Sequence, residues 1–255
     1  MILVSSLKIR FEYKKEIKPN NSLASVFHGI LMENIDTAYA DYLHISQIHP
    51  YSQYITGENG CVVWSINTLD TKSADKIINA LSSEKFMLAD IKSKEIQLNV
   101  VSKELLSQSY TDLLNDYYLD EKSARYITIK FLTPTAFKSK DRYVIFPSSK
   151  LILNSLINRY DSFSGDSTIA DVHLFDYIEN QTEIVEYNLK SVKFSLEGIT
   201  IPSFVGTLKL RFSGNKEFIC LMNMLMRYGE YSGVGIKTSL GMGAYKIIHT
   251  GGVIK

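Results

Sequence analysis

The order in which strand and helix patterns follow one another limits the fold of this chain more than any other feature. Val4–Tyr13 alternates apolar and polar residues, which predicts a half-buried strand. The patterns that follow are helices at 23–31, 37–44 and 72–81, a hairpin at 51–67, and one or two strands at 85–101. This order is β-α-β-β-α-β, which is the ferredoxin-like arrangement.

The second half repeats this order. Its patterns are strands at 126–131 and 143–146, a helix at 151–160, strands at 186–197 and 204–212, a helix at 216–228 and a last strand at 244–249. Residues 161–182 are polar and acidic, and we interpret them as an insertion. The predicted fold is therefore α+β, with two tandem ferredoxin-like (RRM-like) domains that each have an antiparallel sheet. We place these domains at residues 1–121 and 122–255, with a linker near Leu119–Ser123.

A glycine-rich stretch, Gly233–Gly243, lies just before the last predicted strand. It contains two G-x-G pairs, and glycine is favoured where the backbone needs a positive φ or must let another surface come very close. A cation and two hydroxyls lie between the pairs, so side chains and exposed amides together could contact phosphate oxygens. A tight loop in which the glycines serve backbone geometry alone remains the alternative. The residues predicted to bind an anion are Gly233, Gly235, Lys237, Thr238, Ser239, Gly241 and Gly243.

The common nucleotide-binding motifs do not fit this stretch. The dinucleotide fingerprint requires a helix and a second strand after the glycines, but only the segment 244–255 follows. A P-loop requires Gly-Lys followed by Ser or Thr after four spacers, and that pattern is absent. The predicted anion is therefore not held in either of these two ways.

Charge is distributed unevenly along the chain. Residues 1–121 carry 11 Lys and Arg against 16 Asp and Glu, a balance of −5, whereas residues 122–255 carry 17 against 11, a balance of +6. Within the basic half, the segment 160–189 contains no Lys or Arg. The positive charge is thus concentrated on residues 122–159 and 190–255, as a polyanion footprint requires. Differences of this size also occur in proteins that bind no polyanion.

The sequence predicts a soluble, cytoplasmic protein with no membrane association. It has no apolar run of about eighteen residues, and its first segment is charged too early for a signal peptide. Cys61 and Cys220 lie far apart in apolar settings, which favours buried free thiols over a disulfide or a metal pair.

Three of the five histidines, His28, His44 and His49, lie close together in the first half. Their spacing does not match a zinc-binding helix and no Cys is near them, so we predict no metal and no cofactor. Structural roles remain open for two of them. His28 could pack on its helix, and His44 ends a helix, where the dipole favours a positive imidazolium.

Clustered histidines suit RNA cleavage that uses the substrate's own 2′-hydroxyl as nucleophile. The protein must then accept that proton, donate one to the departing 5′-oxygen and stabilise the charged phosphorane. An imidazole can serve either proton step, and a lysine, tyrosine or second histidine can complete the set. Tyr51, next to His49 through Pro50, is one candidate partner.

Three passages together resemble the CRISPR-associated endoribonucleases that process precursor CRISPR RNA, within the RAMP superfamily. The first is the glycine-rich stretch, which reads G-x-G-x5-G-x-G. The second is Phe131–Phe137, followed by Phe146-Pro147 and the helix 151–160. The third is Phe204-Val205-Gly206, ahead of the last helix. The resemblance spans most of the chain and implies tandem ferredoxin-like domains with metal-independent cleavage inside each repeat.

The resemblance also implies roles for individual residues. Members of the family usually carry a histidine near the end of the N-terminal helical segment, and His44 is similar in position, which makes it the first candidate for the proton carrier. His49 stands where relatives can have a lysine. Some relatives have a tyrosine on the first helix where this chain has Met32, and His28 is the nearest substitute. The expected products carry a 2′,3′-cyclic phosphate and a 5′-hydroxyl.

The implied partner is CRISPR repeat RNA, held along its backbone by the second domain. Family membership suggests contacts from Lys237 and from the basic turn Lys138, Lys140 and Arg142. Such contacts weaken in salt and carry little sequence information. A non-catalytic RAMP subunit that only binds CRISPR RNA is the alternative function, and association with an effector complex and a homodimer are both left open.

Overall fold

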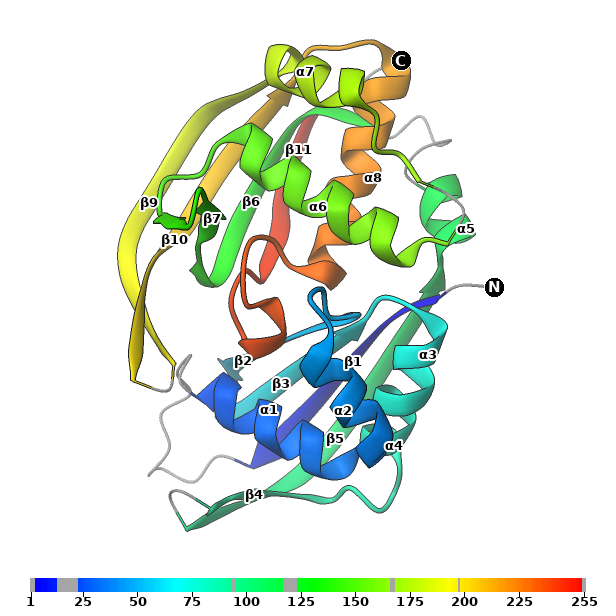
Figure 1. Cartoon of the computed structure of the whole chain (residues 1–255), viewed down its shortest axis with the longest axis vertical. Helices are drawn as coiled ribbons and strands as arrows, with labels where there is room; N and C mark the ends of the chain where they lie inside the picture. Colours follow the sequence, from blue (N-terminus) through cyan, green and yellow to red (C-terminus); the bar gives the residue numbers. More distant parts are fainter. Residues whose placement is uncertain are drawn as a thin grey trace.

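The computed structural model describes residues 3–12, 23–92, 95–116, 123–165, 168–196 and 198–253. Most of the predicted linker lies outside these residues. Figure 1 shows two halves, each an antiparallel sheet with helices packed on one face, stacked along the longest axis of the molecule.

The first half contains a five-stranded sheet in the order β2-β3-β1-β5-β4. Its strands are β1 (Leu3–Glu12), β2 (Tyr51–Glu58), β3 (Cys61–Thr68), β4 (Leu88–Ile91) and β5 (Ile96–Ser109). Without the short edge strand β4, this order is that of a ferredoxin-like sheet, so the prediction is confirmed with one extra strand. Alternation places Leu7 and Ile9 of β1 on the buried face, as the sequence pattern predicted.

Helices cover one face of the first sheet (Figure 1). They are α1 (Leu23–Asn34), α2 (Thr37–Ile45), α3 (Thr71–Ser73) and α4 (Asn79–Ser82), with a π-helical turn at Ala74–Ile78 joining the last two, and α5 (Tyr110–Leu114) follows β5. Asp36 caps α2 by accepting a hydrogen bond from Tyr39 N (3.1 Å), which satisfies one of the free amides at the start of that helix. The helices bury Phe27 against Trp64, with ring centroids 5.0 Å apart.

The second half contains a four-stranded sheet in the order β11-β6-β10-β9, again ferredoxin-like. Its strands are β6 (Ala124–Thr135), β9 (Thr182–Leu196), β10 (Ile199–Phe212) and β11 (Tyr245–Val253), and its helices are α6 (Ser149–Phe163), α7 (Val172–Gln181) and α8 (Lys216–Ser232). Two details differ from the sequence prediction. The strand expected at 143–146 is β8 (Arg142–Val144), which pairs only with β7 (Phe137–Ser139) outside the main sheet, and the expected insertion contains α7.

The apolar cores of the two halves are not fully separate. The core around α6 and α8 also includes Val4, Leu69 and Tyr110, which come from the first half. The Tyr110 hydroxyl donates to Leu69 O (2.9 Å), and the Tyr228 hydroxyl donates to Arg159 O (3.1 Å), while the Tyr110 and Tyr228 rings lie 5.9 Å apart. Buried aromatic contacts of this kind hold the two halves in one arrangement.

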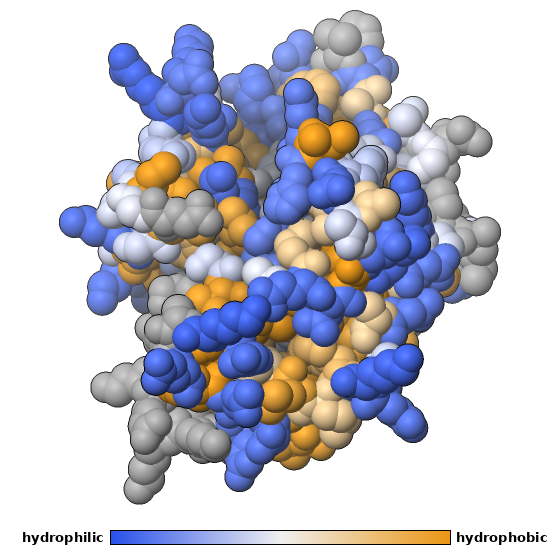
Figure 2. All heavy atoms as spheres, turned by 60° about the horizontal axis from the view of Figure 1, so that its bottom comes forward, coloured by the Kyte–Doolittle hydropathy of each residue, from blue (hydrophilic) through white to orange (hydrophobic). Residues whose placement is uncertain are grey.

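The surface is mixed rather than dominated by one apolar face. On the side shown in Figure 2, hydrophobic patches lie between hydrophilic side chains. The described cysteines are free thiols, with Cys220 buried and Cys61 half-buried, so the expectation of burial holds only for the first. Within the described part of the chain, no helix is both long enough and apolar enough to cross a membrane.

Candidate RNA-cleavage site

The glycine-rich loop, residues 233–243, joins α8 to β11 and lies between the two halves (Figure 1). All four of its glycines have positive φ, and so does Lys237 (56°). A Cβ added at Gly243 would lie 2.0 Å from Val234 O, and one at Gly235 would lie 2.3 Å from Ala136 O. The glycines are therefore required by the backbone, as the geometric alternative proposed, whatever else the loop does.

The three polar residues between the G-x-G pairs face different environments. Lys237 is exposed, whereas Thr238 and Ser239 are buried. The Thr238 hydroxyl accepts a hydrogen bond from Arg159, and Ser239 Oγ is hydrogen-bonded to His49 Nδ1 (2.6 Å). Of these three side chains, the lysine is thus the one presented to solvent, while the two hydroxyls hold the loop to the rest of the protein.

A buried glutamine from β2 fixes the loop to the first half. Gln53 Nε2 donates to Ser239 O and to Ala24 O, at 2.9 Å in both cases. Its Oε1 accepts from Trp64 Nε1 (2.5 Å), so the amide is oriented from both ends. At Gly241, an added Cβ would lie 2.2 Å from Ala24 Cβ, which shows how closely the loop approaches α1.

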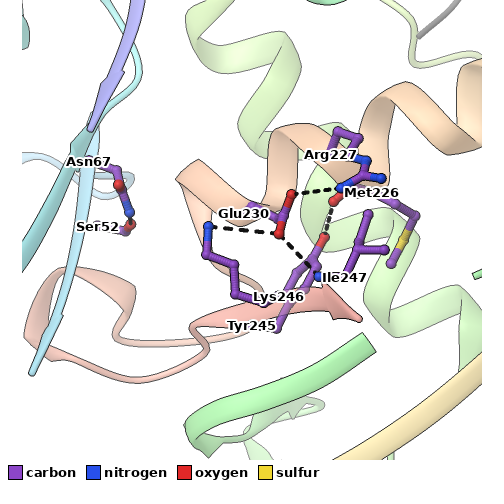
Figure 3. A network of polar contacts seen from close by, with 8 residues as sticks. All are labelled: Ser52, Asn67, Met226, Arg227, Glu230, Tyr245, Lys246 and Ile247. Atoms are coloured by element: carbon purple, nitrogen blue, oxygen red, sulfur yellow. Dashed lines mark hydrogen bonds and ion pairs between the residues drawn. The ribbon is translucent and has the colours of Figure 1, made fainter. Parts of the chain in front are cut away.

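The two stems of the loop are tied together at Glu230, near the end of α8 (Figure 3). Glu230 Oε1 accepts from Ile247 N (3.1 Å) and lies 3.7 Å from Lys246 Nζ, and Oε2 lies 3.4 Å from Arg227 Nη1. The Tyr245 hydroxyl donates to Met226 O (2.7 Å). Figure 3 also shows Asn67 next to Ser52. Asn67 donates to the Ser52 hydroxyl (3.1 Å), which in turn donates to Tyr231 O. These bonds make the loop a rigid platform.

His49 is held at both ring nitrogens. Its Nε2 lies 2.9 Å from Leu43 O, and a carbonyl only accepts, so Nε2 carries a proton and the neutral ring accepts from Ser239 at Nδ1. Burial lowers the pKa of His49, opposed by the hydrogen bond to Leu43 and assisted by the nearby charges of Arg159, His44 and Lys237. His49 therefore links α2 to the loop as a neutral imidazole.

His28, which is half-buried, and Tyr51, which is buried, form a second pair next to His49. Tyr51 Oη and His28 Nδ1 are hydrogen-bonded at 2.9 Å, and the Tyr51 ring lies between the two histidine rings, with centroids 6.4 Å from His28 and 5.7 Å from His49. Burial lowers the pKa of His28 to about 4, with smaller electrostatic contributions from the nearby His49 and His44. Burial also raises the pKa of Tyr51.

This environment predicts that acid destabilises the fold through His28. Its pKa is about 6.5 when unfolded and about 4 when folded, so the unfolded state binds the proton more tightly in this interval. The stabilisation is complete above pH 6.5 and is lost as pH falls toward 4. In His28→Gln, which keeps an acceptor for Tyr51, urea unfolding should show a flatter pH dependence across this interval. The prediction would be contradicted if the free energies of unfolding of wild type and variant differed by the same amount at all pH values.

His44 differs from the other two histidines in being exposed. It lies in the last turn of α2, and its ring makes no hydrogen bond to the residues that the structure describes. It follows Leu43, whose carbonyl oxygen is bonded to His49, so His44 and His49 lie at the same end of α2, and its charge contributes to the lowered pKa values of both His28 and His49. The structure therefore joins His28 and His49 through Tyr51, bonds His49 to the glycine-rich loop, and leaves His44 accessible at the adjoining end of α2.

A pocket of about 490 Å³ opens between the loop, α6 and the segment that follows α2. Three cations line it, Arg159, Lys138 and Lys237, together with His49, and none of the described residues that line it is a carboxylate. Arg159 is 8% exposed, and burial lowers the pKa of its guanidinium without discharging it. Arg159 was not predicted as a site residue. It follows the apolar face of a helix, and nothing in the neighbouring sequence indicates that this cation is buried.

The basic turn is only partly brought to this pocket. Lys138 lines it and pairs with Asp141 at 2.9 Å. Lys140 and Arg142 instead border a separate hollow of about 700 Å³ that also contains Tyr143 and Phe146. Among the described residues, no group of three His, Cys, Asp or Glu side chains has the arrangement of metal ligands.

Known proteins resemble this chain in sequence and in fold. The family model for CRISPR-associated endoribonuclease Cas6 matches residues 129–245. The CRISPR-associated endoribonuclease Cas6 of Streptococcus thermophilus is 34% identical over 245 residues, covering 94% of this chain and 97% of that protein. The protein of the same name from Mycobacterium tuberculosis (strain CDC 1551 / Oshkosh) is 28% identical over 227 residues, covering 89% and 72%.

Solved structures share the fold over the whole chain. A Cas6 product complex superposes with a TM-score of 0.80 at 21% identity, covering 97% of this chain and 100% of that one. Thermus thermophilus Cas6 gives a TM-score of 0.74 at 20% identity, covering 97% and 99%. The tandem ferredoxin-like fold predicted from the sequence is confirmed by this likeness.

Proposed function

The chain belongs to the CRISPR-associated endoribonuclease Cas6 family, and on this basis we propose that it cleaves precursor CRISPR RNA within the repeats to release guide RNAs. The observation that carries the proposal is an exposed histidine, His44, in the last turn of α2, a few residues before the segment 47–49 that lines a pocket with three cations. Two of the similar solved structures are described as a product complex and a substrate mimic complex, which supports RNA as the substrate class.

In the proposed reaction no metal takes part. The 2′-hydroxyl of the nucleotide before the cut attacks the adjacent phosphorus, the bond to the 5′-oxygen breaks, and the products carry a 2′,3′-cyclic phosphate and a 5′-hydroxyl. His44 transfers a proton in this step, as general base or acid, because its ring is exposed and the segment that lines the cationic pocket follows it directly in the chain. Lys237 stabilises the additional negative charge that develops on the phosphorane.

The other two histidines support this step in different ways. Both ring nitrogens of His49 are hydrogen-bonded, so its first role is to fix the end of α2 relative to the loop. To act as the second proton carrier it would first have to release Ser239. His28 is neutral near pH 7 and orients Tyr51, against which His49 packs. Each of these histidines therefore has a positioning role first, and both remain candidates for the second proton transfer.

One experiment tests the reaction. Purified protein is incubated in EDTA with a repeat RNA and, separately, with the same RNA carrying a 2′-deoxy nucleotide at the cut site. The proposal expects cutting of the first RNA only, with a cyclic phosphate on the upstream product. Undiminished cutting of the deoxy substrate would refute 2′-hydroxyl attack. Binding without any cutting would favour the alternative function, a non-catalytic RNA-binding subunit of the RAMP superfamily.

Lys237→Ala should weaken RNA binding mainly through phosphate contacts. Lys237 is exposed on the loop and lines the cationic pocket, so its removal leaves the buried contacts of Thr238 and Ser239 intact. We expect lower affinity, with the slope of log affinity against log salt reduced by about 1. Filter binding at several salt concentrations measures both quantities. The control is Lys85→Ala, which replaces an exposed lysine before β4. If Lys85→Ala lowered the affinity and the salt dependence by the same amounts, Lys237 would have no specific role in RNA binding.

Further parts of the proposal concern the surroundings of the protein. We propose that RNA contacts extend over Lys138, Lys140 and Arg142, that the product RNA passes to an effector complex, that the chain acts in the cytoplasm, and that it forms a homodimer. Light scattering with and without RNA measures the oligomeric state.

A further inference from the structure

The pocket beside the glycine-rich loop has a chemistry that backbone binding alone does not use. Its lining combines the cations Arg159 and Lys237 with apolar side chains such as Ile48, Leu151 and Leu240. Its volume, about 490 Å³, falls in the range of about 300–1,000 Å³ that small-molecule ligands occupy. A phosphate group would fill only a small part of this space and would make no contact with the apolar side chains of the lining.

The guanidinium of Arg159 lacks a compensating anion among the described residues. It donates to neutral oxygens, His49 O at 3.4 Å and the Thr238 hydroxyl, and it forms no ion pair with a described residue. A buried charge is costly unless it is paired. Because five N–H donors are available on this group, donors remain for a phosphate that enters the pocket.

Neutral amides supply a third kind of contact. Gln47, Asn154 and Asn158 line the pocket, and Asn154 Oδ1 is buried without a hydrogen-bond partner in the described protein. An acceptor left unpaired destabilises the free protein, and a donor from a ligand would satisfy it. A nucleobase edge offers N–H donors and acceptors, and its flat faces pack on apolar side chains.

We propose that this pocket accepts one unpaired nucleotide of the RNA, with its phosphate against Arg159 and Lys237 and its base against Ile48 and Leu240. This inference rests on the proposed function and adds a base-binding subsite to it. The base is turned out of the RNA strand, and the amides of Gln47, Asn154 and Asn158 contact its edge. The site thereby contributes base preference, which contacts to the phosphates alone do not supply.

Mononucleotides test the subsite without any cleavage reaction. The whole protein is titrated at low salt with the four ribonucleoside 5′-monophosphates, with ribose 5-phosphate and with inorganic phosphate, and saturation-transfer NMR and thermal shifts are recorded. At least one nucleoside monophosphate should bind tenfold or more tightly than ribose 5-phosphate. Equal binding of nucleotides and ribose 5-phosphate would show an anion site only, and no binding of any probe would show no site; either result overturns the proposal.

Variants separate the two parts of the ligand. Ile48→Ala, a half-exposed apolar position, should weaken the nucleotides several-fold and leave ribose 5-phosphate unchanged. Arg159→Gln should weaken both, and Lys237→Gln repeats this test at an exposed position in case the buried substitution prevents folding. Lys85→Gln should change nothing. Loss of nucleotide binding that is equal in Lys85→Gln and Lys237→Gln would overturn the assignment.

Failure of this inference is distinct from failure of the proposed function. Cleavage of repeat RNA by the same wild-type preparation is measured in parallel. Cutting without a preference for nucleotides over ribose 5-phosphate would refute the subsite alone. Nucleotide binding without cutting would refute the nuclease activity alone.

Discussion

Replacing His44 with alanine is expected to lower the rate of RNA cleavage by about 10²–10⁴-fold, which is the usual contribution of a positioned general acid or base. Affinity for the RNA should stay nearly unchanged, because the ring is exposed and makes no hydrogen bond to the described residues. The fold should also be unaffected, since no buried contact is lost. Single-turnover cleavage, filter binding and thermal unfolding measure these three quantities.

His249→Ala is the matched control for this substitution. His249 is an exposed histidine on β11, outside the cluster of His28, His44 and His49. It should cleave at the wild-type rate. Cleavage by His44→Ala within a few-fold of wild type would exclude His44 as the proton carrier and would direct attention to His49.

A contrasting result is expected at His49. Its imidazole connects Leu43 O to Ser239 Oγ, so His49→Ala removes two contacts between α2 and the loop. Stability and RNA affinity should then fall together with the cleavage rate. A variant that loses cleavage alone would instead indicate that this ring carries a proton. The comparison separates positioning from proton transfer, which the activity of one variant cannot do.

The fold was predictable because the sequence patterns are local. Alternation along β1 and helical spacing along α1 each depend on residues close in sequence, and the order of these elements selects the ferredoxin-like topology. The sequence predicted the fold less well where the structure depends on which strands pair with each other. The apolar run 143–146 is typical of a strand, but only tertiary contacts decide that β8 pairs with β7 outside the main sheet.

The candidate site was predictable only in part. Lys237 and the histidines have residue types that carry phosphate or proton chemistry, so they could be selected from the sequence. Gln53 and Arg159 could not, because their importance comes from partners far along the chain: Gln53 contacts Ser239 O, and Arg159 contacts His49 O. Such long-range contacts have no signature in composition or spacing.

Gly243→Ala is expected to destabilise the protein more than a typical surface substitution. The residue has φ of +74°, and an alanine Cβ would lie 2.0 Å from Val234 O, which is a backbone atom. The left-handed conformation alone costs a residue with a Cβ about 1–2 kcal/mol. Because backbone must move to relieve the clash, overpacking should add about 1–3 kcal/mol. Urea unfolding of wild type and variant measures the sum.

Gly60→Ala separates these two contributions. Gly60 also has positive φ, +78°, but an added Cβ would meet nothing within 4 Å. Its loss of stability should therefore equal the conformational cost alone and be clearly smaller than that of Gly243→Ala. The Gly243 variant should also bind RNA less tightly, because Val234 N and Gly243 O are hydrogen-bonded across the base of the loop that presents Lys237. Equal destabilisation by the two substitutions would mean that the loop backbone moves away from the added Cβ without an energetic penalty. The inference that the loop is a rigid platform would then be wrong.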